Sequence, residues 1–170
     1  MITLALVAPD HAAALQPLLE HPGVAEMTPL PHPYPADGAR DYVAGLIAAR
    51  EAGTRRDWVI LDGAGTPMGV VLIKDIDRTR QEGELGYWLG VPYWGRGHAT
   101  AAARAAISLG FGELGLTSLV ANTLPENGAS VRVLTKLGFT PLREEPWVLP
   151  KWDAPRMGVV LRLLREQWAG

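Results

Sequence analysis

The 170-residue sequence predicts an α+β domain in which helices pack on both faces of a mixed, mostly antiparallel sheet. Three observations predict this class. Short apolar runs alternate with a period of two, whereas other segments repeat their apolar residues at helical spacing. Glycine, proline and charged residues separate the two kinds of segment. The elements follow in the order β-α-α-β-β-β-α-β-α-β-β, and we expect one domain over residues 1–170.

The N-terminal part is expected to supply one strand and two helices. Residues 2–8 alternate like a strand, and Asp10 is a candidate cap for a helix with apolar positions Ala13, Ala14, Leu18 and Leu19. Prolines at 22, 29, 31, 33 and 35 predict an irregular, exposed loop over residues 21–35. Residues 37–52 have the spacing of a second helix, which Gly53 ends.

The remaining elements alternate strands with two helices. Strands are expected at 58–61, 68–73, 84–91, 118–122, 140–148 and 156–163. The first two form a hairpin through the turn Asp62-Gly-Ala-Gly65. Helices are expected from Gly97 to about Gly112 and from 127 to 137, the second closed by Gly138.

Composition excludes several classes of protein. A net charge of −2 offers no basic surface for nucleic acid. Cysteine is absent, which removes disulfides, thiolate metal sites and a cysteine nucleophile, and we expect no metal. No apolar run approaches the ~20 residues of a membrane span, and the N-terminus lacks the basic region of a signal peptide. We therefore expect a cytoplasmic protein without a membrane partner.

The segment 84–100 has the properties of a phosphate site. An alternating run is broken by Pro92, passes through Gly95 and Gly97, and enters an alanine-rich helix. Glycine lets a ligand approach the backbone, and the first helical turn has unpaired N–H donors at the positive end of the helix dipole. These features predict a phosphorylated ligand.

Two common phosphate loops do not fit this segment. A Walker loop requires a Lys-Ser/Thr pair after its glycines, and no such pair follows Gly97. The stretch Gly95-Arg-Gly97-His-Ala-Thr100 partly matches a dinucleotide fingerprint. That fingerprint belongs to a parallel βαβ unit, whereas here it follows an antiparallel meander.

Residues Glu84 to Phe139 resemble the acetyl-coenzyme A core of the GNAT superfamily of N-acetyltransferases. The pyrophosphate loop is matched by Trp94-Gly-Arg-Gly97-His-Ala99, after Gly86-Tyr-Trp-Leu89. A second motif is matched by Pro125-Glu-Asn127, Ser130, Val133-Leu134, Lys136 and Gly138-Phe139. Together, the two motifs resemble those of the RimJ/RimL-like subgroup, whose members acetylate the N-termini of ribosomal proteins.

The resemblance implies a single GNAT-type fold with a sheet splayed after the fourth strand, and acetyl-coenzyme A as co-substrate. The pyrophosphate would lie on the backbone of Arg96, Gly97, His98, Ala99 and Thr100. The pantetheine arm would pair with Leu89, Gly90 and Val91, beside a slot that Pro92 opens. Asn127 would bind pantetheine, although an asparagine there can also act only as a helix cap.

The catalytic residues are less directly indicated. Many members of the superfamily have a tyrosine acid where this chain has Leu134. By resemblance, Ser130 is then the nearest hydroxyl to the coenzyme sulfur and a candidate proton donor. Glu84 is the leading candidate base, with a pKa that nearby tryptophans would raise. A solvated strand-end charge is the alternative, and His98, Asp57 and His32 are weaker candidates.

The acceptor amine is not fixed by these motifs. The resemblance favours a protein N-terminus, but related enzymes acetylate antibiotics, amino acids or polyamines. The loops 21–35 and 148–155 are candidates for the rim of the acceptor site. A non-catalytic acetyl-coenzyme A binding module remains an alternative, and exposed strand edges suggest a homodimer.

Overall fold

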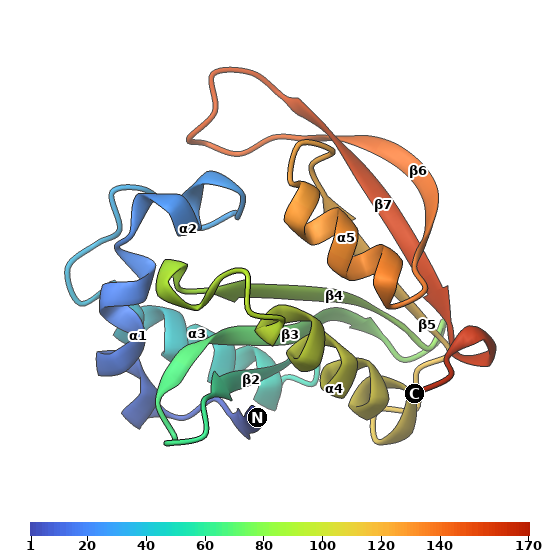
Figure 1. Ribbon diagram of the computed structural model, residues 1–170, viewed down its shortest axis with the longest axis horizontal. Helices are drawn as coiled ribbons and strands as arrows, with labels where there is room; N and C mark the ends of the chain where they lie inside the picture. The colour runs from blue at the N-terminus through green and yellow to red at the C-terminus, as the bar shows by residue number, and fades with distance from the viewer.

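The computed structural model describes residues 1–170 and is built on one seven-stranded sheet with the order β1-β2-β3-β4-β5-β7-β6 (Figure 1). Every neighbouring pair is antiparallel except β4 and β5. The mixed, mostly antiparallel α+β sheet is therefore confirmed. The strands are β1 Thr3–Leu6, β2 Arg56–Leu61, β3 Pro67–Asp77, β4 Glu82–Leu89, β5 Ser118–Thr123, β6 Thr140–Trp147 and β7 Arg156–Leu164.

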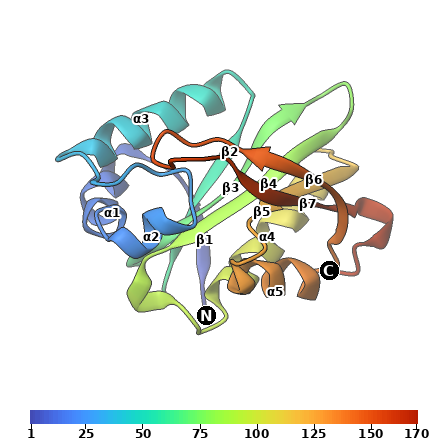
Figure 2. The same ribbon diagram turned by 90° about the horizontal axis from the view of Figure 1, so that it is seen from above.

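Helices cover both faces of the sheet, as predicted (Figure 2). One face packs on α1 (Ala12–Leu19) and α3 (Gly38–Glu51), and the other packs on α4 (His98–Gly112) and α5 (Gly128–Lys136). Residues of β4 alternate between the two cores: Leu85 and Leu89 join the α4 core, whereas Trp88 joins the α1–α3 core. No helix combines the length and apolarity needed to cross a membrane.

The proline-rich segment differs from its prediction. It contains a short helix, α2 (Pro22–Glu26), and Val24 and Ala25 are buried. Pro22 occupies the first helical position, where its missing N–H costs nothing, so proline density did not exclude a helix. Asp10 is also not a cap: it lies in the 3-10 turn η1 (Pro9–His11), and the Ala8 N–H donates to His11 Nδ1 at 3.0 Å.

The splay between β4 and β5 is confirmed, but it begins earlier than Pro92. The parallel ladder pairs Glu82–Leu85 with Ser118–Ala121 and then stops, while β4 stays paired with β3 as far as Leu89. Pro92 lies beyond the strand, in the 3-10 turn η2 (Val91–Tyr93). The separation therefore begins after the Leu85–Ala121 pair, while β5 stays paired with β7, and it leaves four residues of β4 with one unpaired edge.

Candidate active site

The loop that enters α4 presents unpaired backbone donors. Gly95 and Gly97 have φ values of +73° and +80°, a region that side chains disfavour. Gly97 caps α4 without a side chain, and the first helical bond is donated by the Ala101 N–H to the Gly97 carbonyl. The N–H groups of residues 98–100 therefore have no partner within the helix. A Cβ on either glycine would meet no atom within 4 Å, so the space before these donors is open.

Trp94 ties this loop to the end of β4. Its Nε1 donates a hydrogen bond of 2.8 Å to the Leu89 carbonyl, while 49% of the residue stays exposed. The indole thereby fixes the distance between the glycine turn and the strand edge. Arg96 is exposed and His98 opens the first turn of α4, so both lie beside the unpaired backbone donors.

The free edge of β4 begins before the residues that were predicted to line it. The Gly90 N–H donates a hydrogen bond of 2.8 Å to the carbonyl of Met68 on β3. The backbone groups of successive residues in a strand point to alternate sides. The backbone groups of Tyr87 and Leu89 consequently face the splay. The strand predicted to reach Val91 ends at Leu89, and the Val91 carbonyl accepts from the Trp94 N–H. The unpaired edge therefore runs through Tyr87 and Leu89. Gly90 is turned towards β3, whereas the Val91 N–H makes no hydrogen bond within the protein.

The first turn of α5 meets this edge. Asn127 caps the helix because its Oδ1 accepts from the Ser130 N–H at 3.2 Å, while its Nδ2 makes no bond within the protein. Capping and ligand binding are therefore compatible. The Ser130 Oγ lies 3.0 Å from the Tyr87 phenol oxygen. Leu134 is buried in the core, in agreement with the absence of a tyrosine acid at that position.

The sequence interpretation missed Tyr87 as a functional candidate. Burial raises the pKa of its phenol to about 12, so the phenol keeps its proton near neutral pH. The available signal was alternation, because Tyr87 lies on the same face of β4 as Leu85 and Leu89. What alternation could not supply was the position of Ser130, which lies 43 residues further along the chain.

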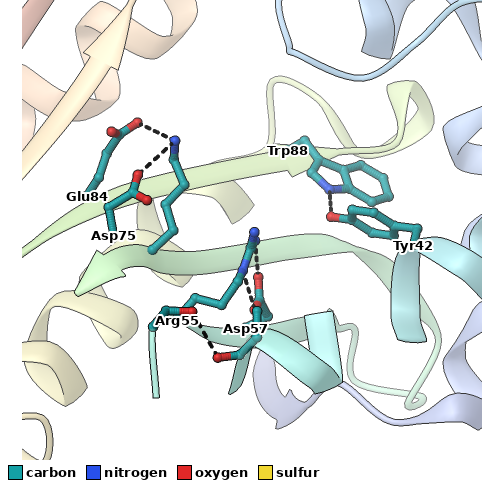
Figure 3. Close-up of polar contacts among 9 residues, drawn as sticks. Tyr42, Arg55, Asp57, Asp75, Glu84 and Trp88 are labelled. Atoms are coloured by element: carbon teal, nitrogen blue, oxygen red, sulfur yellow. Dashed lines mark hydrogen bonds and ion pairs between the residues drawn. The ribbon is translucent and has the colours of Figure 1, made fainter. Parts of the chain in front are cut away.

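Glu84 lies on the opposite face of β4, in a charged cluster (Figure 3). Its carboxylate is 3.3 Å from Lys74 Nζ, which lies at the same distance from Asp75. Burial raises the Glu84 pKa, Lys74 lowers it, and the charges of Asp75 and Glu145 raise it, with a net increase. The raised pKa agrees with expectation, but its source does not, because Trp88 lies at the other end of the strand and donates to the Tyr42 hydroxyl at 3.1 Å.

The weaker base candidates lie in other surroundings. Asp57 is buried on β2 and binds Arg55 through two hydrogen bonds, one of 2.8 Å and one of 2.5 Å. Burial raises the Asp57 pKa, although Arg55 opposes this. His32 lies in the exposed loop after α2. Glu84 is therefore the candidate nearest the point where β4 and β5 part.

The two loops expected to frame the acceptor are joined by one side chain. Lys151, between β6 and β7, donates from Nζ to the backbone carbonyls of Ala25, Thr28 and Leu30, the last at 2.6 Å. Figure 1 shows the β6–β7 loop reaching α2 above the end of β4. The structure thus brings segments 21–35 and 148–155 together on the face that carries Glu84.

Comparison with known proteins agrees with this arrangement. Residues 2–140 match the family described as the acetyltransferase (GNAT) domain. An uncharacterized N-acetyltransferase of Bacillus licheniformis is 33% identical over 89 residues, covering 52% of this chain and 50% of that protein. YdaF of Bacillus subtilis, a putative ribosomal N-acetyltransferase, is 29% identical over 92 residues, 50% of each chain. The match thus spans about half the length of these curated relatives.

Solved structures share the fold over nearly the whole chain. RimL, a ribosomal alpha-N-protein acetyltransferase in complex with coenzyme A, superimposes with a TM-score of 0.89 at 17% identity, covering 98% of this chain and 95% of RimL. A spermidine N-acetyltransferase from Vibrio cholerae, in complex with coenzyme A and spermine, gives 0.86 at 15% identity, covering 99% and 98%. Because the family match covers most of its length, the chain belongs to the GNAT acetyltransferase family.

Proposed function

We propose that this protein transfers the acetyl group of acetyl-coenzyme A to a primary amine, the α-amine of a protein N-terminus. The observation that carries the proposal is the meeting of three features at the splay. These are the open donor turn at Gly97, the unpaired edge of β4, and the Tyr87–Ser130 pair. RimL and the Vibrio cholerae spermidine acetyltransferase share the fold, and the solved structures of both are complexes with coenzyme A.

The donor would be held mainly by backbone. The N–H groups of residues 98–100, with Arg96 nearby, suit the pyrophosphate. The backbone groups of Tyr87 and the N–H of Leu89 suit the amides of the pantetheine arm, because they would continue a strand-like ladder. The Asn127 Nδ2, which is free of protein partners, supplies a further donor.

The remaining chemistry is proton transfer. The new N–C bond forms as the C–S bond breaks, so the amine loses a proton and the departing thiolate gains one. Glu84 takes the first proton through water, and its raised pKa makes it a better base than an ordinary carboxylate. Ser130 gives the second proton and regains one from the Tyr87 phenol, 3.0 Å away, and solvent reprotonates the phenol before the next turnover.

A small amine is a second candidate acceptor. The carboxylates of Glu84, Asp75 and Glu145 lie near one another and would attract a polyamine as well as an N-terminus. The fold shared with the spermidine enzyme is consistent with this alternative. The cytoplasmic location, the single domain and the homodimer remain predictions from the sequence.

Thiol release from acetyl-coenzyme A tests the proposal. The protein is assayed against short peptides that begin with Ser or Ala, and against spermidine. We expect turnover with peptides and loss of it in Glu84→Gln. Coenzyme A binding by calorimetry, together with no thiol release for any amine, would leave a binding module and contradict the proposed transfer.

A further inference from the structure

We propose that Asn122 and Trp147, on either side of Gly158, bind the main chain of the acceptor peptide at its second residue. The inference rests on the proposed function, because it assumes that an amine acceptor reaches Glu84. It goes further in naming the part of the acceptor that is recognised, the backbone N–H and C=O of one extended residue.

The three residues lie beside the reaction centre. Asn122 follows Ala121, whose pairing with Leu85 is the last rung between β4 and β5. Successive side chains of a strand point to opposite faces, so Asn122 points away from the core that holds Ala121. It shares its face with Val120, which pairs with Glu84, and therefore lies on the Glu84 face.

The amide of Asn122 is only half satisfied. Its Nδ2 donates to Glu145 Oε1 at 3.0 Å, which fixes the orientation of the amide. Its Oδ1 is buried and has no hydrogen-bond partner. Leaving a buried acceptor unpaired is costly, so this oxygen calls for a donor, and no donor of the protein bonds to it.

Gly158 keeps the approach to these polar atoms free of a side chain. A Cβ there would stand 3.0 Å from Asn122 Oδ1 and 2.9 Å from Trp147 Nε1, too close for any side chain. The φ of Gly158 is not positive, so the requirement for glycine is space and not conformation. The two polar atoms flank one point and are at most about 6 Å apart.

Trp147 supplies the complementary donor. Its ring stacks on Trp152 with a centroid distance of 6.3 Å and an angle of 14°, which holds the indole in place. The indole N–H makes no hydrogen bond within the protein, and an indole can only donate. The site therefore offers one acceptor and one donor a few ångströms apart, as a residue of a neighbouring β-strand does.

This pattern fits a peptide better than a polyamine. An extended residue presents its N–H and C=O on the same side, so it can pair with Asn122 Oδ1 and Trp147 Nε1 together. A polyamine carries N–H donors but no acceptor that remains free at neutral pH, and it would leave the indole unpaired. The N-terminal amine of the peptide, one residue earlier, would then lie towards Glu84.

An ester-substituted acceptor tests the contact directly. Two peptides beginning Ser-Ala are compared, one normal and one with an ester in place of the first peptide bond, which replaces the second residue's N–H by an oxygen. In the unmodified protein we expect the ester to lower kcat/KM about 10-fold. In Asn122→Leu, which has no acceptor oxygen, the ester should cause no further loss. An equal ester penalty in both proteins would overturn the inference.

A second variant guards against misfolding of Asn122→Leu. Gly158→Ala should raise the KM for the normal peptide and leave coenzyme A binding unchanged by calorimetry. Gly112→Ala is the matched control, because a Cβ at Gly112 meets nothing within 4 Å. Turnover of spermidine without turnover of peptides would overturn this site while leaving acetyl transfer standing. Absence of thiol release with every amine would overturn both.

Discussion

The phenol oxygen of Tyr87 lies 3.0 Å from the hydroxyl oxygen of Ser130 and links the free edge of β4 to the first turn of α5. The pair stands where the two strands part, between the donor turn and the Glu84 face. Burial raises the Tyr87 pKa to about 12, so the phenol is protonated at neutral pH. A proton that Ser130 gives up can be returned by this phenol, which solvent then reprotonates between turnovers.

Removing either hydroxyl should slow the chemical step. General acid catalysis contributes at least about 100-fold, so Ser130→Ala should lower kcat by about that factor with little change in KM for acetyl-coenzyme A. Tyr87→Phe should lower kcat about 10-fold, because Ser130 would lose its partner. The two effects should not add in the double variant. Tyr93→Phe and Ser108→Ala are matched controls outside the pair, and equal rates in Ser130→Ala and Ser108→Ala would exclude Ser130 as the acid.

The pH dependence should respond in opposite directions to the two neighbours of Glu84. The base must be deprotonated, so activity falls as the pH drops through its pKa. Lys74 lowers that pKa, and Lys74→Met should move the acidic limb of kcat/KM to higher pH. Asp75 raises it, and Asp75→Asn should move the limb to lower pH. If neither variant shifts the limb, a different group titrates there.

Coenzyme A affinity should depend on Gly97 beyond the strain of its backbone. Gly97→Ala puts a Cβ in the open space before the α4 donors and should weaken coenzyme A binding by about 10-fold or more, measured by calorimetry. Gly53→Ala is the matched control, since Gly53 has a φ of +75° and equally open surroundings. It should carry the same left-handed penalty of about 1–2 kcal/mol without changing affinity. Equal affinities in both variants would contradict binding at this turn.

The contact of Lys151 with α2 should support acceptor binding. Lys151→Met leaves the carbonyls of Ala25, Thr28 and Leu30 without the ammonium, and should cost about 1–3 kcal/mol of unfolding free energy. Hydrogen exchange should quicken around α2, and KM should rise for the acceptor but not for acetyl-coenzyme A. Lys136→Met, at an exposed site on α5, serves as control. Unchanged exchange at α2 would show that the contact is not maintained in solution.

Local patterns predicted the elements that depend on short-range rules. Apart from α2, the order of strands and helices is as expected, and Gly138 closes α5 with a φ of +89°, the left-handed conformation that a glycine cap adopts. The one helix missed, α2, is too short to show helical periodicity and begins at a proline. Strand ends shifted by up to four residues, as in β3, which extends beyond the expected residue 73 to Asp77, where it still pairs with Glu82. Pairing with a neighbour, and not only the strand's own composition, decides where a strand stops.

The sequence by itself determined the part of the protein expected to bind acetyl-coenzyme A. The glycine turn, the strand and the capped helix are each formed by residues close together along the chain. Only the tertiary structure decided the partners of Ser130, Glu84 and Asn122. Those contacts join residues that are distant in sequence, and long-range packing rather than local propensity determines which side chains meet. The site where the acceptor is expected is made of such contacts, and it became visible only once β4, β5 and β7 were assembled in one sheet.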